Sequence, residues 1–520
     1  MSALQVILFV PDYFRVRRCT EPAPPGSADI EVVTFDTSIE TADTIEDKLE
    51  RLGNEEMAGG TGLMAGSARS RDVLRDICNS YMEVQDDLDE LRRSGRMDMV
   101  LVDGTRAAHC LSLIPAYLGA PFVAFGSYIE PFDSASPLPT SYYPAPLSAL
   151  SSNMGFFQRL TNFLYYAYRA WNGELWGDFH QGNSLGVRVG RLDHHVLIKK
   201  AAVYLENSDC IVDYPKATFP NFVQVGGLTA SPAKPLPGPL KKFFDGGADT
   251  GVVVVSLGTY VFNPNKNLED KLLTAFRRLD TRILLRLNAS RSVTRLKNLQ
   301  TVSWFPQNDA LGHPNTKVFV SLCGQNSFFE ALYHGVPMLC CHFAGSDVLG
   351  TGARVAEYGV GLSIDLLAAS PDSVLAAIST LLTDKSFTRR VKAASKLFRS
   401  RSESAVQRAA GAVEHVLKFG GGYLRPRTVE MNFFQYAGLD VALALFTFIL
   451  AAAAAVGFVV WKHLPQSQQV PKAKEVNEAA NPASGETPAT KTFKSDSDRG
   501  HPVLATCVAL LVIILFYVVV

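Results

Sequence analysis

Short apolar runs alternate with helix-like segments through the first half of the chain. Residues 5–11, 29–35, 97–102 and 121–125 are rich in β-branched and aromatic side chains, which is typical of buried strands. Residues 107–118 have helical spacing between two of these runs. A strand, a helix and a second strand in this order predict parallel βαβ units, and therefore an α/β fold.

A second series of the same kind begins after residue 250. Four prolines between residues 232 and 239 precede it, and because proline fixes φ and donates no hydrogen bond, they mark a linker. The sequence therefore predicts two Rossmann-like domains, whose ligands should bind beyond the carboxyl ends of the strands. The strands expected in this series are 251–256, 282–287, 317–321 and 336–341, and the helices are 267–279, one from about 327, one after about 350, 371–383 and 386–418.

The C-terminal end is the most apolar part of the chain. Residues 441–460 contain no charged side chain, and Trp461 and Lys462 follow them. This pattern predicts a helix that crosses a bilayer core and ends at its interface. Residues 503–520 form another uncharged run, which predicts a second span or the removable tail of a lipid-anchor signal. Residues 463–502 are too polar to form a core and predict a linker.

Composition narrows the class of protein. The 520 residues include 50 basic and 50 acidic side chains, so the basic surface of a nucleic-acid-binding protein is not expected. Hydrophobic residues make up 47% of the chain, too many for a mainly disordered protein. The 8 cysteines contain no CxxC pair, so neither a zinc site nor a disulfide framework is predicted.

Polar and glycine-containing segments follow several of the predicted strands. Residues 256–259 would let backbone N–H groups approach an anion, although an ordinary turn explains them equally well. Residues 324–327 precede a helix whose N-terminus would bind phosphate, and a capping box of Ser327 and Glu330 is the alternative. Trp304 is suited to stacking on a nucleobase, or to closing the core at a strand end.

Together these segments resemble the UDP-glycosyltransferases, the family of the UDP-glucuronosyl- and UDP-glucosyltransferases. The resemblance is dense from about residue 210 to 462 and thin before residue 97. The stretches that carry it are Trp304-Phe305-Pro306-Gln307-Asn308-Asp309, Leu311-Gly312-His313-Pro314, Cys323-Gly324-Gln325-Asn326-Ser327 with Glu330, His334-Gly335-Val336-Pro337-Met338, Val225-Gly226-Gly227-Leu228, and Phe434-Gln435-Tyr436 with Leu439-Asp440.

The resemblance implies a GT-B architecture, in which two Rossmann-like domains face each other across a cleft and one or more transmembrane helices follow. It implies inverting transfer of a hexosyl group from a UDP-sugar, as co-substrate, to a hydroxyl of a small lipophilic acceptor, without metal or other cofactor. The expected divisions are 1–230 for the acceptor domain with a shortened first helix, 231–245 for the linker, 246–430 for the UDP-sugar domain, 439–461 for the transmembrane helix, 463–502 for a disordered linker and 503–520 for the second span or tail.

The resemblance also implies partners and a location. We expect a UDP-sugar, the lipophilic acceptor and a membrane as partners, no nucleic acid, and an endoplasmic reticulum enzyme with lumenal catalytic domains; a homo- or hetero-oligomer is compatible with the sequence. Asp103, at the end of its strand, matches the aspartate that orients the catalytic base, or caps the turn before Gly104. The residues expected to hold the UDP-sugar are Trp304 on uracil, Gln307 on its edge, Glu330 on the ribose hydroxyls, Gly324, Asn326 and Ser327 at the diphosphate, Asp347 on the sugar, and Ser256, Gly258 and Thr259 beside them.

Three positions depart from the family's pattern. The phosphate-contacting histidine falls at Leu322, and the glutamine after the sugar-contacting aspartate falls at Val348. The catalytic histidine after the first strand is not found at residues 11–15, and the gap to the next strand is too short for a full crossover helix. Asp12 and His109 are the alternative bases that the sequence offers.

An incomplete N-terminus would explain both the missing histidine and the lack of a signal peptide, because residues 4–10 are better interpreted as a strand. General-base assistance is worth about 10²–10⁴-fold in rate. The competing hypothesis is therefore a catalytically weakened relative that binds a nucleotide sugar, a lipid or a partner subunit.

Overall fold

The computed structural model describes most of the chain between residues 85 and 463, together with two earlier strands. Several sequence-based expectations lie outside the described residues: the shortened first helix with Asp12, His109, Thr259, Asp347, and everything after residue 463. The described residues are 6–11, 30–35, 85–95, 97–105, 110–145, 148, 150–175, 194–258, 266–287, 296–342, 348–436 and 438–463.

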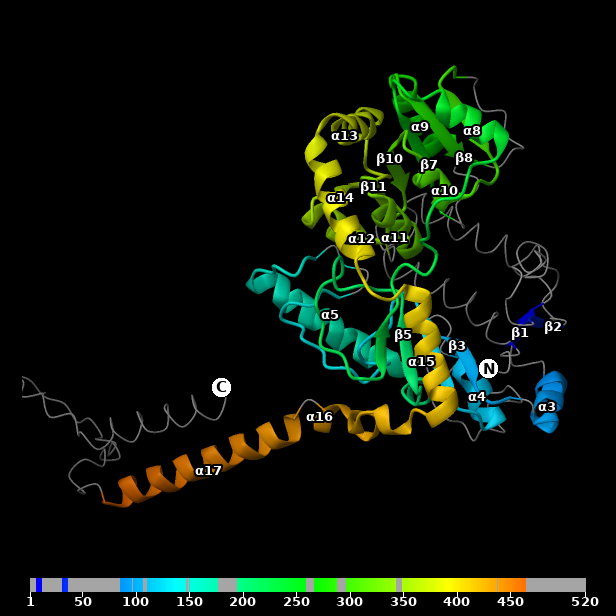
Figure 1. The fold of residues 1–520 in the computed structure, drawn as a ribbon. Helices are drawn as coiled ribbons and strands as arrows, with labels where there is room; N and C mark the ends of the chain where they lie inside the picture. The colour runs from blue at the N-terminus through cyan, green and yellow to red at the C-terminus, as the bar shows by residue number, and fades with distance from the viewer. Residues whose placement is uncertain are drawn as a thin grey trace, which may run out of the picture. The chain divides into compact units, whose positions relative to one another are not determined.

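The predicted strand–helix–strand unit after residue 97 is present. Strand β3 (Val100–Asp103) is followed by α4 (Leu113–Leu118) and by β4 (Phe122–Gly126), which lies parallel to β3. β5 (Val203–Glu206) and β6 (Phe222–Gln224) complete a four-stranded parallel sheet (Figure 1).

Two strands and three helices also belong to this part of the chain. The strands pair parallel, with Val6 opposite Ile30, as their apolar runs predicted. The elements are β1 (Val6–Pro11), β2 (Ile30–Phe35), α3 (Gln85–Ser94), α5 (Phe156–Leu175) and α7 (His194–Ile198).

The second sheet has six parallel strands and confirms the second α/β series. Its order is β12-β11-β10-β7-β8-β9. The strands are β7 (Val252–Ser256), β8 (Arg282–Arg286), β9 (Leu299–Val302), β10 (Thr316–Ser321), β11 (Met338–His342) and β12 (Gly361–Asp365). The helices are α8 (Gly238–Asp245), α9 (Lys266–Phe276), α10 (Gln307–Leu311), α11 (Gln325–His334), α12 (Leu349–Glu357), α13 (Pro371–Thr383) and α14 (Lys385–Arg399).

Strand β7 shows why the apolar runs form this sheet. Its valines are fully buried, and alternate side chains point to opposite faces. Val253 and Val255 join one hydrophobic cluster with α9 and α13, whereas Val252 and Val254 join another with α8 and α11. Because helices cover both faces, four consecutive positions of the strand are apolar rather than every second one.

The order of the strands determines where a ligand binds. From β7 the chain steps to β8 and β9 on one side, then returns to place β10 against the other side of β7. This reversal is a topological switch point, the place where open α/β sheets bind their ligands.

The helix expected at 386–418 is wrong, since two helices occupy this segment. α14 ends at Arg399, and α15 (Ala405–Phe419) begins after Ser404, whose side chain accepts a hydrogen bond from Gln407 N in a capping box. α15 packs against β5 and β6, where Val416 joins the cluster of Val203 and Val225. The first sheet is therefore covered in part by a helix from much later in the chain.

The predicted helix at 439–461 is present as α17 (Leu439–His463), which has 25 residues and no buried side chain. By length and composition it is able to cross a membrane. Two short 3₁₀ turns and α16 (Phe433–Tyr436) precede it. Residues Met1–Leu439 and Asp440–Val520 form separate compact units.

Candidate functional site

The switch point lies between the carboxyl ends of β7 and β10. Ser256 and Ser321 are register partners at the carboxyl ends of these strands. The Ser256 hydroxyl is buried and has no hydrogen-bond partner among the described residues. Gly258 follows with φ 82°, which favours glycine, and a Cβ built on it would meet nothing within 4 Å. Both features leave polar backbone and a hydroxyl available to a ligand.

The N-terminus of α11 opens on the same edge of the sheet. Gly324 caps the helix without any side-chain hydrogen bond, and a Cβ there would also meet nothing within 4 Å. The helix starts at Gln325, so Ser327 and Glu330 lie inside it and do not form a capping box; that alternative is wrong. An uncapped helix N-terminus offers free N–H groups and the positive end of the dipole to an anion.

Three of the predicted residues are in direct contact. Gln307, the first residue of α10, donates through Nε2 to Ser327 Oγ at 3.0 Å and to Glu330 Oε2 at 2.7 Å. Glu330 is buried, and burial raises the pKa of its carboxyl, while hydrogen bonds from Gln307 and Thr229 lower it. Gln307 and Thr229 thus both hold the carboxylate in place.

Trp304 lies between β9 and α10, close in sequence to Gln307. Its side chain is 64% exposed, whereas Phe305 beside it is 4% exposed and belongs to the core. The alternative that Trp304 closes the core is therefore wrong, because Phe305 has that place. An exposed indole face is free to stack on a planar ring.

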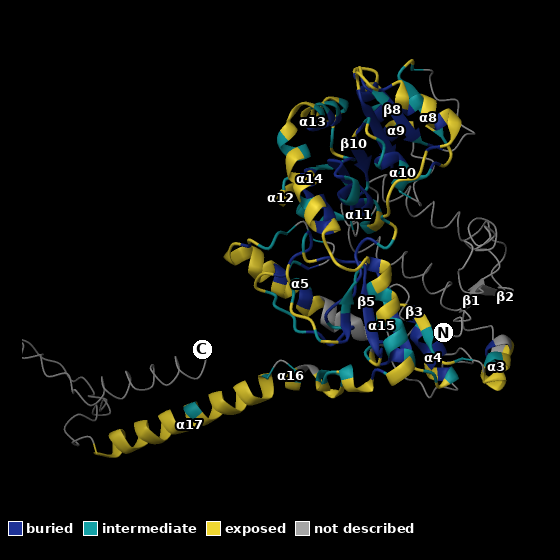
Figure 2. Ribbon diagram, viewed as in Figure 1, coloured by how far each residue is buried: buried dark blue, intermediate teal, exposed yellow. Residues whose placement is uncertain are grey.

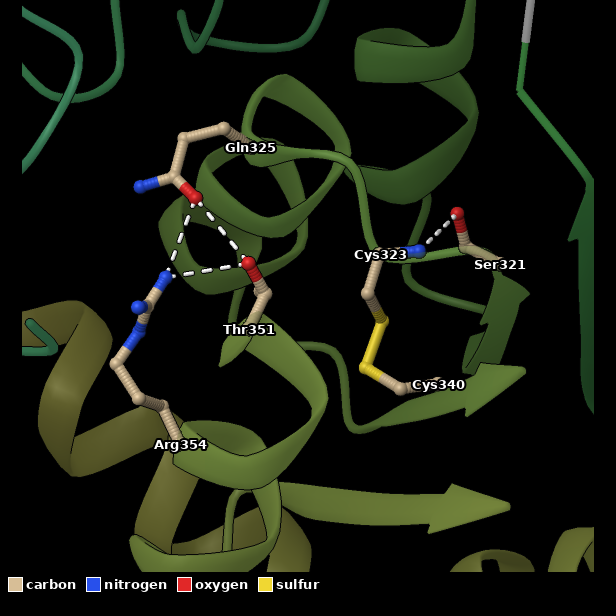
Figure 3. The surroundings of a disulfide bond; sticks show 6 residues. All are labelled: Ser321, Cys323, Gln325, Cys340, Thr351 and Arg354. Carbon is tan, nitrogen blue, oxygen red and sulfur yellow. Dashed lines mark hydrogen bonds between the residues drawn. A yellow bond between two sulfur atoms is a disulfide. The ribbon is translucent and has the colours of Figure 1, made fainter. Parts of the chain in front are cut away.

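The first turn of α11 is tied to the loop after β5, which the sequence did not predict. Asn207 donates through Nδ2 to Asn326 Oδ1 at 2.8 Å, and its backbone oxygen accepts from Gln325 Nε2 at 3.0 Å. Gln325 Oε1 accepts from Thr351 and Arg354, and Arg354 pairs with Asp213 at 3.1 Å. Asn326 and Gln325 thus link the two sheets, and Figure 3 shows Gln325, Thr351 and Arg354 directed at one another.

A disulfide joins the loop before α11 to the neighbouring strand, contrary to the prediction from cysteine spacing. Cys323 and Cys340 are fully buried with 5.3 Å between their Cα atoms (Figure 3). They are 17 residues apart in sequence, but β10 and β11 pair with Ser321 opposite Cys340. The bond holds the residue that directly precedes Gly324.

The departures from the family's pattern have local structural accounts. Leu322 packs against the hydrophobic core, and Val348 is the N-cap residue of α12. His342, the last residue of β11, was missed by sequence reasoning. Burial lowers the pKa of its imidazole, and Nδ1 is buried without a hydrogen-bond partner among the described residues. His342 lies two residues after Cys340, so the two side chains are on the same face of the strand.

Asp103 is the last residue of β3, as predicted. Its Oδ1 accepts a hydrogen bond from Thr105 N at 2.8 Å, which is the turn-capping contact. The residue lies at the surface, and desolvation by the surrounding protein still raises the pKa of its carboxyl. Its role toward a base stays a prediction, since residues 12–29 and 106–109 lie outside the described part of the chain. Within the described part, no group of three or more His, Cys, Asp or Glu side chains is placed to hold a metal ion.

Two parallel sheets covered by helices, with an uncapped helix N-terminus at the switch point of the second, are the architecture of the GT-B glycosyltransferases. Residues 21–474 match the family model for UDP-glucuronosyl and UDP-glucosyl transferase. The chain belongs to this family.

Comparisons with individual proteins agree with this assignment. UDP-glucuronosyltransferase 2C1 of Oryctolagus cuniculus is 31% identical over 385 residues, which cover 72% of this chain and 75% of that protein. UDP-glucuronosyltransferase 2B30 of Macaca fascicularis is 30% identical over 404 residues, with 76% and 74% covered. The crystal structure of an Os79 variant from O. sativa in complex with UDP superimposes with a TM-score of 0.53 at 16% identity, over 80% of this chain and 93% of that one, and supports the fold.

Proposed function

We propose that this protein is a membrane-anchored glycosyltransferase that moves a hexosyl group from a UDP-sugar to a hydroxyl of a small lipophilic acceptor, with inversion. The observation that carries the proposal is the contact of Gln307 with Ser327 and Glu330, beside the exposed Trp304. Residues predicted separately to meet uracil, ribose and phosphate therefore lie around one edge of the second sheet.

Each part of the nucleotide finds suitable chemistry at this edge. The indole of Trp304 stacks on uracil, and the amide of Gln307 pairs with its edge. The Glu330 carboxylate accepts hydrogen bonds from ribose hydroxyls, and charge-assisted bonds of this kind are stronger than neutral ones. The first turn of α11 binds the diphosphate through N–H groups, which also stabilise the negative charge on departing UDP.

The acceptor hydroxyl attacks the anomeric carbon from the side opposite UDP, which inverts its configuration. The C–O bond to UDP breaks as the new glycosidic bond forms, and a base removes the hydroxyl proton. Asp103 orients that base and, where the base is a histidine, stabilises the positive charge it acquires on taking the proton. Asp12 and His109 remain the candidate bases, and the transferred sugar is a glucosyl, glucuronosyl or related hexosyl group.

The membrane anchor is α17, and the location is the endoplasmic reticulum with the catalytic domains in the lumen. The helix has 25 residues and an uncharged run at 441–460, which is long enough for a bilayer crossing, and Trp461 and Lys462 suit the interface. The Cys323–Cys340 disulfide supports a lumenal location, because disulfides persist in oxidising compartments and are rare in the cytosol. An oligomer of identical or related chains is compatible with this arrangement.

Trp304→Ala tests the nucleotide site. Base stacking on an aromatic side chain is worth about 1–3 kcal/mol, so the Kd for UDP should rise about 5–150-fold. The fold should be unaffected because the side chain is 64% exposed. Isothermal titration calorimetry measures the Kd, and Trp304→Phe is the matched control that keeps a ring. An unchanged Kd in Trp304→Ala would show that uracil does not stack there.

The buried carboxyl of Glu330 should make UDP binding depend on pH. Only the ionised carboxylate accepts hydrogen bonds from both ribose hydroxyls, and burial raises the pKa of Glu330 above its ordinary 4.5. UDP affinity should therefore fall as the pH falls through this raised pKa. Glu330→Gln should bind UDP more weakly at neutral pH and lose this part of the pH dependence. A wild-type profile in the variant would remove Glu330 from the ribose site.

A further inference from the structure

Asn207 directly follows β5, whose four residues are all buried (Figure 2). The residue itself is 2% exposed. Its backbone N–H donates to Gly126 O at 2.8 Å, and its backbone oxygen accepts from Gln325 Nε2 at 3.0 Å. Both ends of its side-chain amide are also hydrogen-bonded, as the burial of a polar side chain requires. Asn207 is therefore fixed in place and in orientation.

A backbone N–H determines which way the amide of Asn207 faces. Gly227 N donates to Asn207 Oδ1 at 3.1 Å, and because a backbone N–H is only a donor, the amide oxygen must face it. The amide nitrogen of Asn207 then faces α11, where it donates to Asn326 Oδ1 at 2.8 Å. The second amide is oriented in turn, since its oxygen is held at Asn207 and its Nδ2 is directed elsewhere.

The glycines of the Val225-Gly226-Gly227-Leu228 segment allow this N–H to reach Asn207. A Cβ on Gly226 would lie 2.5 Å from Phe329 Cζ in α11, and one on Gly227 would lie 2.6 Å from Phe398 Cζ. Gly227 also has φ 88°, which favours glycine. The backbone can approach α11 this closely only without side chains at both positions.

Asn326 is the second residue of α11 and is exposed beside the uncapped N–H groups of the helix. Its Nδ2 makes no hydrogen bond to any residue that the structure describes. The two ends of an amide have nearly the same shape, but one donates and the other accepts. The bond at Oδ1 therefore decides whether an anion at this helix end meets a donor or a repelling oxygen.

We propose that Asn207 is a positioning residue for the diphosphate of the UDP-sugar, because it holds the amide of Asn326 with Nδ2 toward a phosphate oxygen. The inference rests on the function proposed above, in which the first turn of α11 binds the diphosphate. Hydrogen bonds to a charged phosphate are stronger than neutral ones. The donor is in place before the ligand arrives, so less ordering is needed on binding. A residue of the first sheet thereby completes the nucleotide site of the second.

A double-mutant cycle in the full-length protein tests this, with UDP and uridine as ligands. Uridine has the base and the ribose but no diphosphate, and ligand-observed NMR titration measures both dissociation constants. Asn326→Ala should raise the Kd for UDP about 10–100-fold, the range for a hydrogen bond to a charged group. Asn207→Ala should raise it about 2–10-fold, since Asn326 stays present but loses its fixed orientation. The double variant should bind UDP no more weakly than Asn326→Ala, and the Kd for uridine should not change.

Two further variants control for loss of structure. Tyr214→Phe removes the hydrogen bond from Tyr214 to Glu357 Oε2 at 2.5 Å, which also joins the segment after β5 to a helix of the second sheet. It should leave both dissociation constants unchanged. Asn207→Asp keeps the shape and the acceptor for Gly227 N but has no donor for Asn326. Even if Asn207→Ala does not fold, Asn207→Asp should weaken UDP and spare uridine.

The other outcomes overturn the inference in distinguishable ways. Equal losses of UDP and uridine affinity in the Asn207 variants would show that Asn207 supports the nucleotide site as a whole. Additive losses in the double variant would show that Asn207 acts without Asn326. An unchanged Kd for UDP in Asn326→Ala would remove its amide from the diphosphate. A wild-type protein that binds neither UDP nor uridine would overturn the proposed function itself.

Discussion

Asp103→Asn should lower kcat about 10²–10⁴-fold, the range expected when general-base assistance is lost. The carboxylate is proposed to orient the base and, where the base is a histidine, to stabilise the positive charge that the imidazole acquires in the transition state. Asparagine has the same shape and still accepts the hydrogen bond from Thr105 N, so the turn after β3 should persist. The predicted UDP residues belong to the other sheet, so the Kd for UDP should not change. Transfer of the sugar to a lipophilic acceptor by the purified protein measures the effect.

Asp98→Asn is the control, since Asp98 is an exposed carboxylate just before the same strand. Unaltered kcat in Asp103→Asn would remove this residue from catalysis. If the wild-type protein binds UDP but shows neither transfer nor UDP-sugar hydrolysis above background, the competing hypothesis of a catalytically weakened relative is supported instead. Failure of UDP to bind at all would contradict both.

Removing the disulfide by Cys323→Ala with Cys340→Ala should lower the free energy of unfolding by about 3 kcal/mol. The bond closes a loop across a sequence separation of 17 residues, and loop closure restricts the unfolded chain by about this much. Both cysteines are fully buried, so some loss of packing adds to the effect. Denaturant unfolding of the isolated protein, with and without a dithiol reductant, measures it.

Reduction of the wild-type protein should produce part of this loss, and reductant should destabilise the double variant less than the wild-type protein, which also loses the Cys323–Cys340 bond. Cys210→Ala is the control, because Cys210 is exposed and free. The affinity for UDP should also fall in the double variant, since Cys323 directly precedes Gly324 at the N-terminus of α11. If the reductant changes neither unfolding nor UDP affinity, the bond contributes nothing to the fold or the site.

The sequence predicted the elements whose burial is simplest. Strand β7 begins with four consecutive buried valines, and the predicted helix 371–383 is α13, with Ser370 as its N-cap. These features depend on side chains close together in sequence, which periodicity and capping describe well. A local pattern also marks the break between α14 and α15, because Ser404 and Gln407 have the spacing of a capping box. The prediction missed this break because the sequence has helical periodicity on both sides of it.

The parts that sequence reasoning missed depend on register and tertiary contact. Spacing alone did not show that Cys323 meets Cys340, because their proximity follows from the pairing of β10 with β11. Nor did the sequence distinguish Trp304 from Phe305, since two adjacent aromatic residues are equally suited to the core until the backbone turns one of them outward. Asn207 and Asn326 are 119 residues apart and meet only in the folded chain.

The packing of α15 on the first sheet has a mechanical consequence. The second sheet and its helices are an insertion in the first domain, joined to it by two chain crossings, near residues 226–237 and 400–404. Arg408 of α15 donates a hydrogen bond to Gln224 O at 3.0 Å, and Tyr436 donates one to Ser136 O. These bonds hold α15 and the segment before α17 to the first domain. Tension on the anchor is therefore borne by the first domain. The second sheet and its helices lie outside this load path, and they stay attached to the first domain by the two crossings and by contacts such as Asn207 to Asn326.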